Sequence, residues 1–254
     1  MLEARGLTKY YSAITGVRDV SFQVPPGTVL GLLGPNGSGK STTVGMLTGL
    51  LEPSGGTVLL NGANIRDDLL AYKQRLGYVP EEAQLYTWMS GAEFLSFGAR
   101  LRGLEARQAA RRIDALLGIF GMQIDKDAPM SAYSKGMRQK ILLSAALLHN
   151  PSIVILDEPC SGLDVGATLV VRSLIQRLAA GGRIIIYSSH ELEIVEKVCT
   201  DVLILRDGRV AAHATTAAIR EQVNASSLED AFRALVFTTD VDAVAGEIVD
   251  AITR

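Results

Sequence analysis

A glycine-rich segment that ends in lysine and serine, GPNGSGKS at residues 34–41, constrains this chain more than any other sequence feature. It matches the pattern G-x-x-x-x-G-K-[ST], in which glycines allow backbone N–H groups to approach a dense anion. A short apolar run at residues 29–33 precedes the segment, and residues 42–51 after it have helical spacing. Because the order is strand, glycine loop and helix, we predict that the loop binds the phosphates of a nucleoside triphosphate.

The residue types in this phosphate loop indicate how the anion would be held. Lys40 is expected to reach the β- and γ-phosphates and to assist catalysis, and the Ser41 hydroxyl is expected to ligate Mg²⁺. The predicted nucleotide contacts are Gly34, Pro35, Asn36, Gly37, Ser38, Gly39, Lys40, Ser41 and Thr42. The alternative, a glycine-rich turn of no consequence, is disfavoured by the strand and helix patterns on either side.

Two adjacent acids, Asp157 and Glu158, follow a β-branched apolar run at residues 153–156. In an open α/β sheet, ligands lie at the carboxyl ends of the strands, where the phosphate loop is also expected. Asp157 is then placed to hold Mg²⁺, and Glu158 is placed to polarise an attacking water as general base. An ordinary pair of acids at a strand end is the alternative, and the phosphate loop favours the catalytic interpretation.

The composition limits the class of protein. The 254 residues are 48% hydrophobic and 20% charged, which excludes a disordered chain and allows one large α/β domain or a core with a subdomain. A formal net charge of -2 argues against broad binding to nucleic acid. Cys160 and Cys199 are too few for a disulfide framework and are expected to be buried fillers. Without a run of 18 uncharged apolar residues, the chain is not expected to span a membrane.

Strand-like and helix-like segments alternate along the chain on both sides of a mostly helical stretch at residues 91–150. The strand patterns lie at residues 17–24, 29–33, 57–60, 76–79, 153–156, 183–187 and 202–205. They predict an α/β fold with a mixed, largely parallel sheet, an N-terminal antiparallel β portion and a helical subdomain insert.

The same pattern gives expected boundaries within one domain that covers residues 1–237. The expected parts are a core at residues 1–82 and 151–237, a helical subdomain at about residues 83–150, and a weakly patterned tail at residues 238–254.

Together these residues resemble an ATP-binding cassette (ABC) protein, the nucleotide-binding subunit of a transporter, over residues 2–208. Residues 133–139 (YSKGMRQ) resemble the family signature, and residues 161–164 (SGLD) resemble the loop after the catalytic glutamate. His190 resembles the switch histidine, and Tyr11 stands where the family stacks an aromatic ring on adenine. The resemblance implies a P-loop NTPase core with bound ATP and Mg²⁺.

The resemblance also implies that two chains pair head to tail to complete two sites. In the family, the signature of one protomer grips the γ-phosphate bound to the other, which gives this role to Ser134 and Gly136. Asp164 would help to align the opposed protomer, and His190 would hydrogen-bond the γ-phosphate and the attacking water. On the residues alone, Ser134 is as readily an ordinary helix cap, and His190 a residue at a helix start.

Two positions, Glu81 and Lys135, depart from the usual family pattern. Glu81 stands where the family usually has glutamine, and it keeps an oxygen ligand for Mg²⁺ while adding a negative charge. Lys135 belongs to a signature that reads SKGM rather than SGGQ, and it adds a cation near the partner's phosphates. Both variants resemble those of bacterial ABC-2-type exporter ATPases, which pair with separate six-helix permeases.

The resemblance therefore implies a Mg-dependent ATPase subunit that pairs with an identical or related cassette. It would drive a permease on another chain, for export, at the cytoplasmic face of the cell membrane. An apolar cluster, Leu85, Tyr86, Trp88 and Met89, would border the groove for a cytoplasmic helix of the permease, with core packing as an equal alternative.

Two rival functions remain at this point. A soluble ABC-type ATPase that acts on nucleic acid or ribosomes is disfavoured by the near-neutral charge and the single cassette. A P-loop kinase or GTPase would leave the signature-like segment and His190 unexplained.

Overall fold

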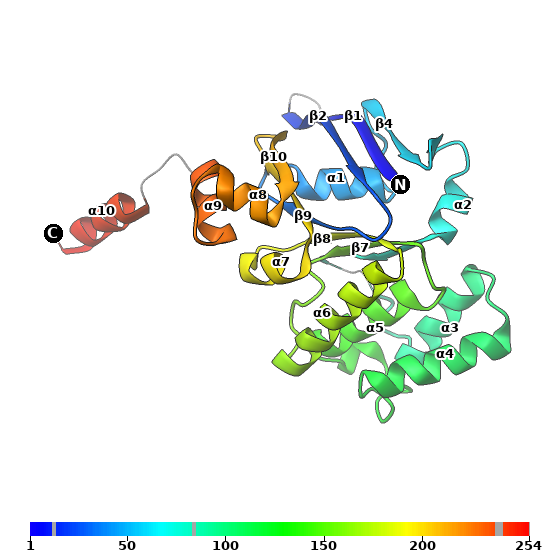
Figure 1. The fold of residues 1–254 in the computed structure, drawn as a ribbon. Coiled ribbons are helices and arrows are strands. Elements are labelled where there is room, and N and C mark those ends of the chain that lie inside the picture. Colours follow the sequence, from blue (N-terminus) through cyan, green and yellow to red (C-terminus); the bar gives the residue numbers. More distant parts are fainter. Residues whose placement is uncertain (12–13, 83–84, 237–240, 254) are drawn as a thin grey trace.

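The computed structural model describes residues 1–11, 14–82, 85–236 and 241–253, and it contains two sheets (Figure 1). The antiparallel sheet has the order β2-β1-β4-β5, with β1 (Leu2–Tyr11), β2 (Ile14–Val24), β4 (Gly55–Leu60) and β5 (Ala63–Asn64). The larger sheet has the order β10-β9-β3-β8-β7-β6, with β3 (Val29–Leu33), β6 (Leu76–Val79), β7 (Ile153–Asp157), β8 (Ile184–Ser188), β9 (Asp201–Arg206) and β10 (Arg209–Thr215). Only β10 pairs antiparallel within the described part of that sheet, which confirms the predicted fold class.

The helices fall into three groups along the chain. Those before β7 are α1 (Lys40–Leu47), α2 (Leu69–Gln74), α3 (Gly91–Leu101), α4 (Ala106–Ile119), a 3₁₀ turn at Met130–Ala132 and α5 (Lys135–Leu147). Those between the later strands are α6 (Val165–Ala180) and α7 (Leu192–Val198), and those after the last strand are α8 (Thr216–Gln222), α9 (Leu228–Val236) and α10 (Val241–Thr253). In Figure 1, α3 to α6 lie together on one side of the larger sheet, and α10 stands away from the rest.

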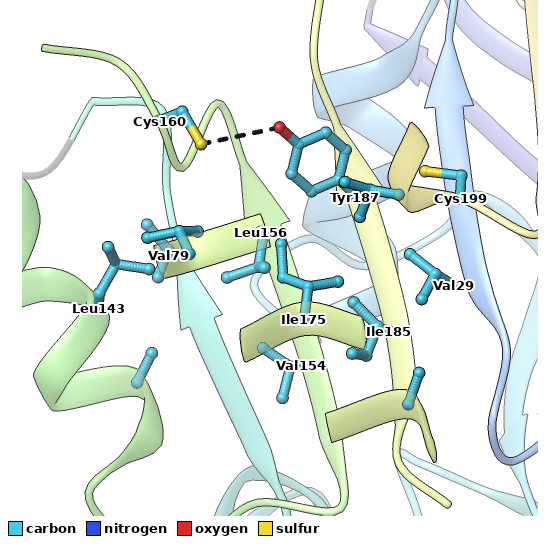
Figure 2. Close-up of a cluster of buried hydrophobic side chains, with 14 of the residues drawn as sticks. Val29, Val79, Leu143, Val154, Leu156, Cys160, Ile175, Ile185, Tyr187 and Cys199 are labelled. Atoms are coloured by element: carbon cyan, nitrogen blue, oxygen red, sulfur yellow. Dashed lines mark hydrogen bonds between the residues drawn. The ribbon is translucent and has the colours of Figure 1, made fainter. Parts of the chain in front are cut away.

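Strand β7 shows why the larger sheet is covered on both faces. Its residues 153–156 are apolar without interruption, as in a parallel strand that is buried on both sides, and Asp157 ends it. Ile153 and Ile155 belong to the core beneath α1 and the antiparallel sheet, and Val154 and Leu156 belong to the core beneath the helices. Figure 2 shows Val154 and Leu156 beside Ile175 of α6. Because both faces of β7 are buried, the strand is held firmly, and the two acids at its end have a defined position.

The two cysteines confirm their predicted role as buried fillers. Both are free thiols in the helix-side core, and the Tyr187 hydroxyl donates a hydrogen bond to the sulfur of Cys160 over 3.9 Å (Figure 2). No helix in the described ranges is long and apolar enough to cross a bilayer.

The structure differs from the sequence expectation at the first helix and after residue 208. Helix α1 begins at Lys40 and ends at Leu47, whereas helical spacing extends over residues 42–51. Gly49 explains the early end, because its φ of +69° takes the left-handed conformation that terminates helices. Helices α8 and α9 are additions, because both are short and are held by packing on β10 and α7, whereas the Asp207-Gly208 dipeptide is typical of the hairpin that joins β9 to β10.

Candidate active site

One pocket of about 860 Å³ gathers most of the predicted site residues at the carboxyl ends of β3, β7 and β8. The predicted residues that line it are Gly34, Pro35, Asn36, Gly37, Gly39, Lys40, Ser41, Thr42, Glu81, Asp157, Glu158 and His190. Ser38 lies beneath the loop and is only 2% exposed. The sequence order of strand, loop and helix therefore places the residues where the open-sheet rule expects a ligand.

The phosphate loop can take its shape because glycines stand where side chains have no room. A Cβ on Gly34 would lie 2.3 Å from the Ser38 hydroxyl, and a Cβ on Gly39 would lie 2.4 Å from a methyl of Val17. Gly39 is also the N-cap of α1, and no side chain caps the helix there. The first N–H groups of α1 are thus available to an anion in the pocket.

Lys40 is held against its own loop. Its Nζ donates hydrogen bonds to the carbonyl oxygens of Gly34 at 2.6 Å and Pro35 at 3.1 Å. Burial lowers the pKa of Lys40, and the carboxylates of Asp157 and Glu158 act in the opposite direction. The amine is therefore already positioned over the loop that would hold the phosphates.

Asp157, the last residue of β7, is a carboxylate in an unfavourable environment for its charge. It is 6% exposed, and burial raises its pKa, with the charges of Glu81 and Glu158 adding to the shift. Such a concentration of negative charge fits a divalent cation, and the donors nearby, including the Ser41 hydroxyl, are hard oxygen ligands. Among the described residues, no group of three or more His, Cys, Asp or Glu forms a metal site alone, so phosphate oxygens would have to complete one.

Glu158 and His190, predicted from separate motifs, are in contact. The Oε1 of Glu158 accepts a hydrogen bond from the His190 N–H at 2.8 Å and lies 2.9 Å from its Nδ1. Ser189 donates from its hydroxyl to Oε2 at 3.2 Å. The register of β7 and β8 pairs Asp157 with Ser188, which brings the two strand ends together. The Glu158 side chain is 12% exposed and the His190 side chain 80%, so a water at the pocket can reach both.

The backbone at Glu158 is strained. Its φ is +48°, in the left-handed region that non-glycine residues rarely occupy. The N–H of Glu158 donates to the Ser188 carbonyl at 2.9 Å, which holds the peptide in this conformation. The strain aims the carboxylate toward His190 rather than along the direction of the strand.

Tyr11 lies beside the phosphate loop. Its hydroxyl is 3.5 Å from the Thr42 hydroxyl, and its ring packs against Gly16, where a Cβ would come within 2.7 Å of a ring carbon. Thr15 and Gly16 line the pocket next to it. The role of Tyr11 in stacking on adenine stays a prediction.

The signature-like segment lies apart from this pocket. Within the part of the chain that the structure describes, Ser134, Gly136 and Asp164 are outside the pocket lining. The Ser134 hydroxyl caps α5 by accepting from the Met137 N–H at 3.2 Å, and Asp164 caps α6 by accepting from the Ala167 N–H at 2.8 Å. A Cβ on Gly136 would lie 2.5 Å from the Gly162 carbonyl, so this segment packs on the loop after Glu158.

Several pocket residues were not predicted. Ser189 had a usable signal, because a hydroxyl residue directly before the switch-like histidine can orient the neighbouring carboxylate. Thr15 and Gly16 follow Tyr11 on β2 and had a weaker signal. Phe232 of α9 also lines the pocket, and no motif in the sequence points to it.

Comparison with known proteins identifies the family. A sequence model described as ABC transporter matches residues 17–161, more than half of the chain. The chain is 36% identical over 220 residues to the ABC transporter ATP-binding protein NatA of Bacillus subtilis, covering 86% of this chain and 89% of that protein. The chain belongs to the ABC transporter family. It is an ATP-binding subunit and an ATPase of that family.

Two further comparisons agree with this ABC membership. The cassette is 34% identical over 212 residues to the Nod factor export ATP-binding protein I of Ralstonia nicotianae, covering 84% of this chain and 66% of that protein. A solved ATP-binding subunit of an ABC transporter has a TM-score of 0.87 and 34% identity, covering 92% of this chain and 99% of the other. The ABC family and fold exclude the rival P-loop kinase or GTPase.

Proposed function

We propose that this cassette hydrolyses Mg-ATP as one half of a head-to-tail pair and drives an export permease on another chain. The observation that carries the proposal is the contact of Glu158 with His190 and Ser189 at the edge of the pocket that the phosphate loop lines. Glu158, the general base of this proposal, and its hydrogen-bond partners thus line the same pocket as the groups suited to bind phosphate.

Each residue then has a task at a stated atom. The N–H groups of the loop and the Nζ of Lys40 hold the phosphates, because they are donors aimed at a dense anion. The Glu158 carboxylate accepts a proton from the attacking water, and His190 orients that water and the γ-phosphate. Ser41, Asp157 and Glu81 would hold Mg²⁺ together with phosphate oxygens, and the ion would neutralise phosphate charge when bound.

The second copy follows from the position of the signature-like segment. Ser134 is the N-cap of α5 and Gly136 lies in its first turn, where N–H groups have no partner within the helix, yet both residues lie outside the pocket of their own chain. In a two-fold pair, each chain can present the N-terminal end of α5 to the pocket of the other chain. Such a pair completes two sites at once. We propose that Asp164 aligns this pair, and the partner is a second copy or a close relative.

The permease would contact the exposed aromatic residues of the predicted apolar cluster. Leu85 and Met89 pack on the core, whereas Trp88 is 75% exposed and its ring lies 5.2 Å from that of Tyr86. Beside them is a groove of about 330 Å³ lined by Tyr86, Phe94 and Phe97, among others. We propose that this groove, in the helical subdomain of about residues 83–150, receives a cytoplasmic helix of the permease.

A membrane co-sedimentation experiment tests the groove. Trp88→Asp should reduce the fraction of this chain that sediments with membranes containing the permease, whereas Ile124→Asp, at a residue 96% exposed elsewhere in the subdomain, should leave it unchanged. The opposite pattern would place the permease on another surface.

Export and location rest on the relatives. The similarity to a Nod factor export protein supports export, and a permease partner supports a place at the cytoplasmic face of the membrane. The net charge of -2 supports a function without nucleic acid.

The proposed role of Glu158 is tested by Glu158→Gln. ATP hydrolysis should fall by about 10²- to 10⁴-fold, because the amide cannot take a proton from water, while ATP binding persists and a closed dimer accumulates. Steady-state phosphate release and size-exclusion chromatography with ATP measure the two effects. Glu193→Gln, at an exposed glutamate of α7, is the matched control and should hydrolyse normally. Near-normal hydrolysis by Glu158→Gln would remove Glu158 from the base role.

A further inference from the structure

Three backbone segments meet behind the nucleotide pocket. They are the phosphate loop at Ser38, strand β2 at Arg18, and the Asp207-Gly208 turn between β9 and β10. The turn lies between the other two segments, because its Gly208 peptide groups bond to both. The Gly208 N–H donates to the Ser38 carbonyl at 3.2 Å, and the Arg18 N–H donates to the Gly208 carbonyl at 2.7 Å.

Both segments held by this turn continue into the pocket. The phosphate loop presents its N–H groups there, and β2 brings Thr15 and Gly16 to the adjoining wall. Gly39 of the loop also touches β2, since a Cβ on it would lie 2.7 Å from the Gly16 carbonyl. The wall formed by Thr15 and Gly16 lies next to Tyr11, the residue predicted to stack on adenine.

The contact of the turn with β2 is so close that a side chain at position 208 would have to displace the β2 backbone by a few tenths of an ångström. A Cβ on Gly208 would lie 3.1 Å from the Gly16 carbonyl oxygen and 3.2 Å from the Val17 Cα, both backbone atoms that cannot rotate away. The φ of Gly208 is +73°, and Asp207 before it has a φ of +50°. Two separate requirements, a left-handed conformation and a close approach, therefore coincide at Gly208.

The chain contains a second turn that isolates the first requirement. Asn61 and Gly62 join β4 to β5 with φ values of +52° and +85°, nearly those of the Asp207-Gly208 turn. A Cβ on Gly62 would meet nothing within 4 Å. The same substitution at the two turns thus imposes the same kind of backbone strain, but only at Gly208 does it push on the pocket.

We propose that the Asp207-Gly208 turn sets the position of the phosphate loop relative to the Thr15 and Gly16 wall, with Gly208 as the positioning residue. The inference rests on the proposed nucleotide site and adds a residue that does not touch the nucleotide. A ligand that spans both parts of the site needs them at a fixed separation, so displacement of the turn weakens binding of ATP. The contact of Glu158 with His190 lies just beyond the ends of β7 and β8, and neither hydrogen bond of the Gly208 peptide groups reaches these two strands.

The test compares Gly208→Ala, Gly208→Asn and Gly62→Ala in the full chain, with ATP as the ligand. Both Gly208 variants should raise the Kd for ATP by about tenfold and leave kcat at saturating ATP within about twofold. Asparagine tolerates positive φ, so Gly208→Asn reports the close approach rather than the backbone conformation. Gly62→Ala should change the Kd for ATP by less than about twofold, and thermal unfolding checks that all variants fold.

Each contrary outcome overturns the inference in a distinct way. A normal Kd in Gly208→Ala excludes the positioning role, and rescue of the Kd by Gly208→Asn reduces the effect to backbone strain. If Gly62→Ala raises the Kd for ATP as much as the Gly208 variants do, the weaker binding is a general consequence of destabilisation. If the unaltered chain itself fails to bind ATP, the proposed nucleotide site is wrong rather than the role of Gly208.

A second measurement uses the unaltered chain and needs no variant to fold. Addition of ATP should slow hydrogen exchange at the Arg18 and Gly208 amides, because the ligand tightens the two segments that the turn joins. The Asn61 amide, which donates to the Met1 carbonyl at the other turn, should exchange at the same rate with and without ATP. Unchanged exchange at Arg18 and Gly208 contradicts the inference.

Discussion

Asp157 and Glu158 are neighbours in the chain, yet their side chains have different surroundings. Asp157 is buried beside Ser41 and Glu81, where oxygen donors gather, whereas Glu158 turns to contact His190 and Ser189. The strained backbone at Glu158 produces this divergence within a single peptide unit. Under the proposed function, one strand end would therefore supply both a ligand for a cation and a base for water.

Lys40 gives the first prediction at the scale of residues. Lys40→Ala should weaken ATP binding by about 100-fold, since it removes a charge-assisted contact to the phosphates. Isothermal titration with ATP measures the affinity. Lys126→Ala, at a lysine paired with Asp114 in the helical part of the chain, is the control and should bind ATP normally. An unchanged affinity in Lys40→Ala contradicts the phosphate-loop assignment.

His149 gives a prediction about pH and stability. Its Nε2 lies 3.0 Å from the Leu76 carbonyl and 2.9 Å from Nη1 of Arg102. Burial lowers the pKa of His149 from 6.5 to about 4, and Arg102 adds to the shift. Between these values the unfolded chain binds a proton at this imidazole and the folded chain does not, so the free energy of unfolding decreases as the pH falls through this range.

Urea unfolding near neutral pH and at about pH 5 tests this effect of His149. The unaltered chain should lose about 1 kcal/mol more than His149→Gln over this interval, a figure reduced for partial exposure to solvent. An equal loss in the two proteins would show that His149 does not contribute to the acid sensitivity.

At the scale of elements, the strands and helices predicted best are those whose ends can be read from the residues of the element itself. Strands β3 and β6 match their apolar runs at both ends, because a strand buried on two faces is continuous in apolar residues. The contact between Glu158 and His190 was only half predicted: both residues were named, but their pairing depends on the register of β7 and β8. Phe232 could not be predicted, since only packing of α9 brings it to the pocket.

Helix α5 carries the prediction at this scale. Ser134→Arg should reduce ATP hydrolysis at least about tenfold while leaving ATP affinity unchanged, because a bulky cation would block the helix end that we propose to meet the partner's nucleotide. Ser131→Arg, at an exposed serine just before α5, should retain hydrolysis. If Ser134→Arg hydrolyses ATP normally, the signature role of this helix end is wrong.

At the scale of the whole molecule, the separation of the signature-like segment from the phosphate loop predicts complementation between two inactive variants. A mixture of Lys40→Ala and Ser134→Arg chains forms mixed pairs in which one of the two sites has an intact loop and an intact signature. With equal amounts and random pairing, hydrolysis should recover to about a quarter of the unaltered rate. Phosphate release by the mixture measures this recovery, and none at all would argue for sites completed within one chain.

Because Glu158 holds a left-handed backbone conformation, a substitution at this position can raise thermal stability while it lowers the rate of ATP hydrolysis. Glycine at this position would relax the conformation that the acid must hold at a cost of about 1 kcal/mol. A variant library screened only for survival of heating should therefore collect glycine at position 158, and the hardiest clones would be the ones that no longer consume ATP. Any programme to stabilise this cassette has to score hydrolysis at every round, because at this position the two traits are inversely linked.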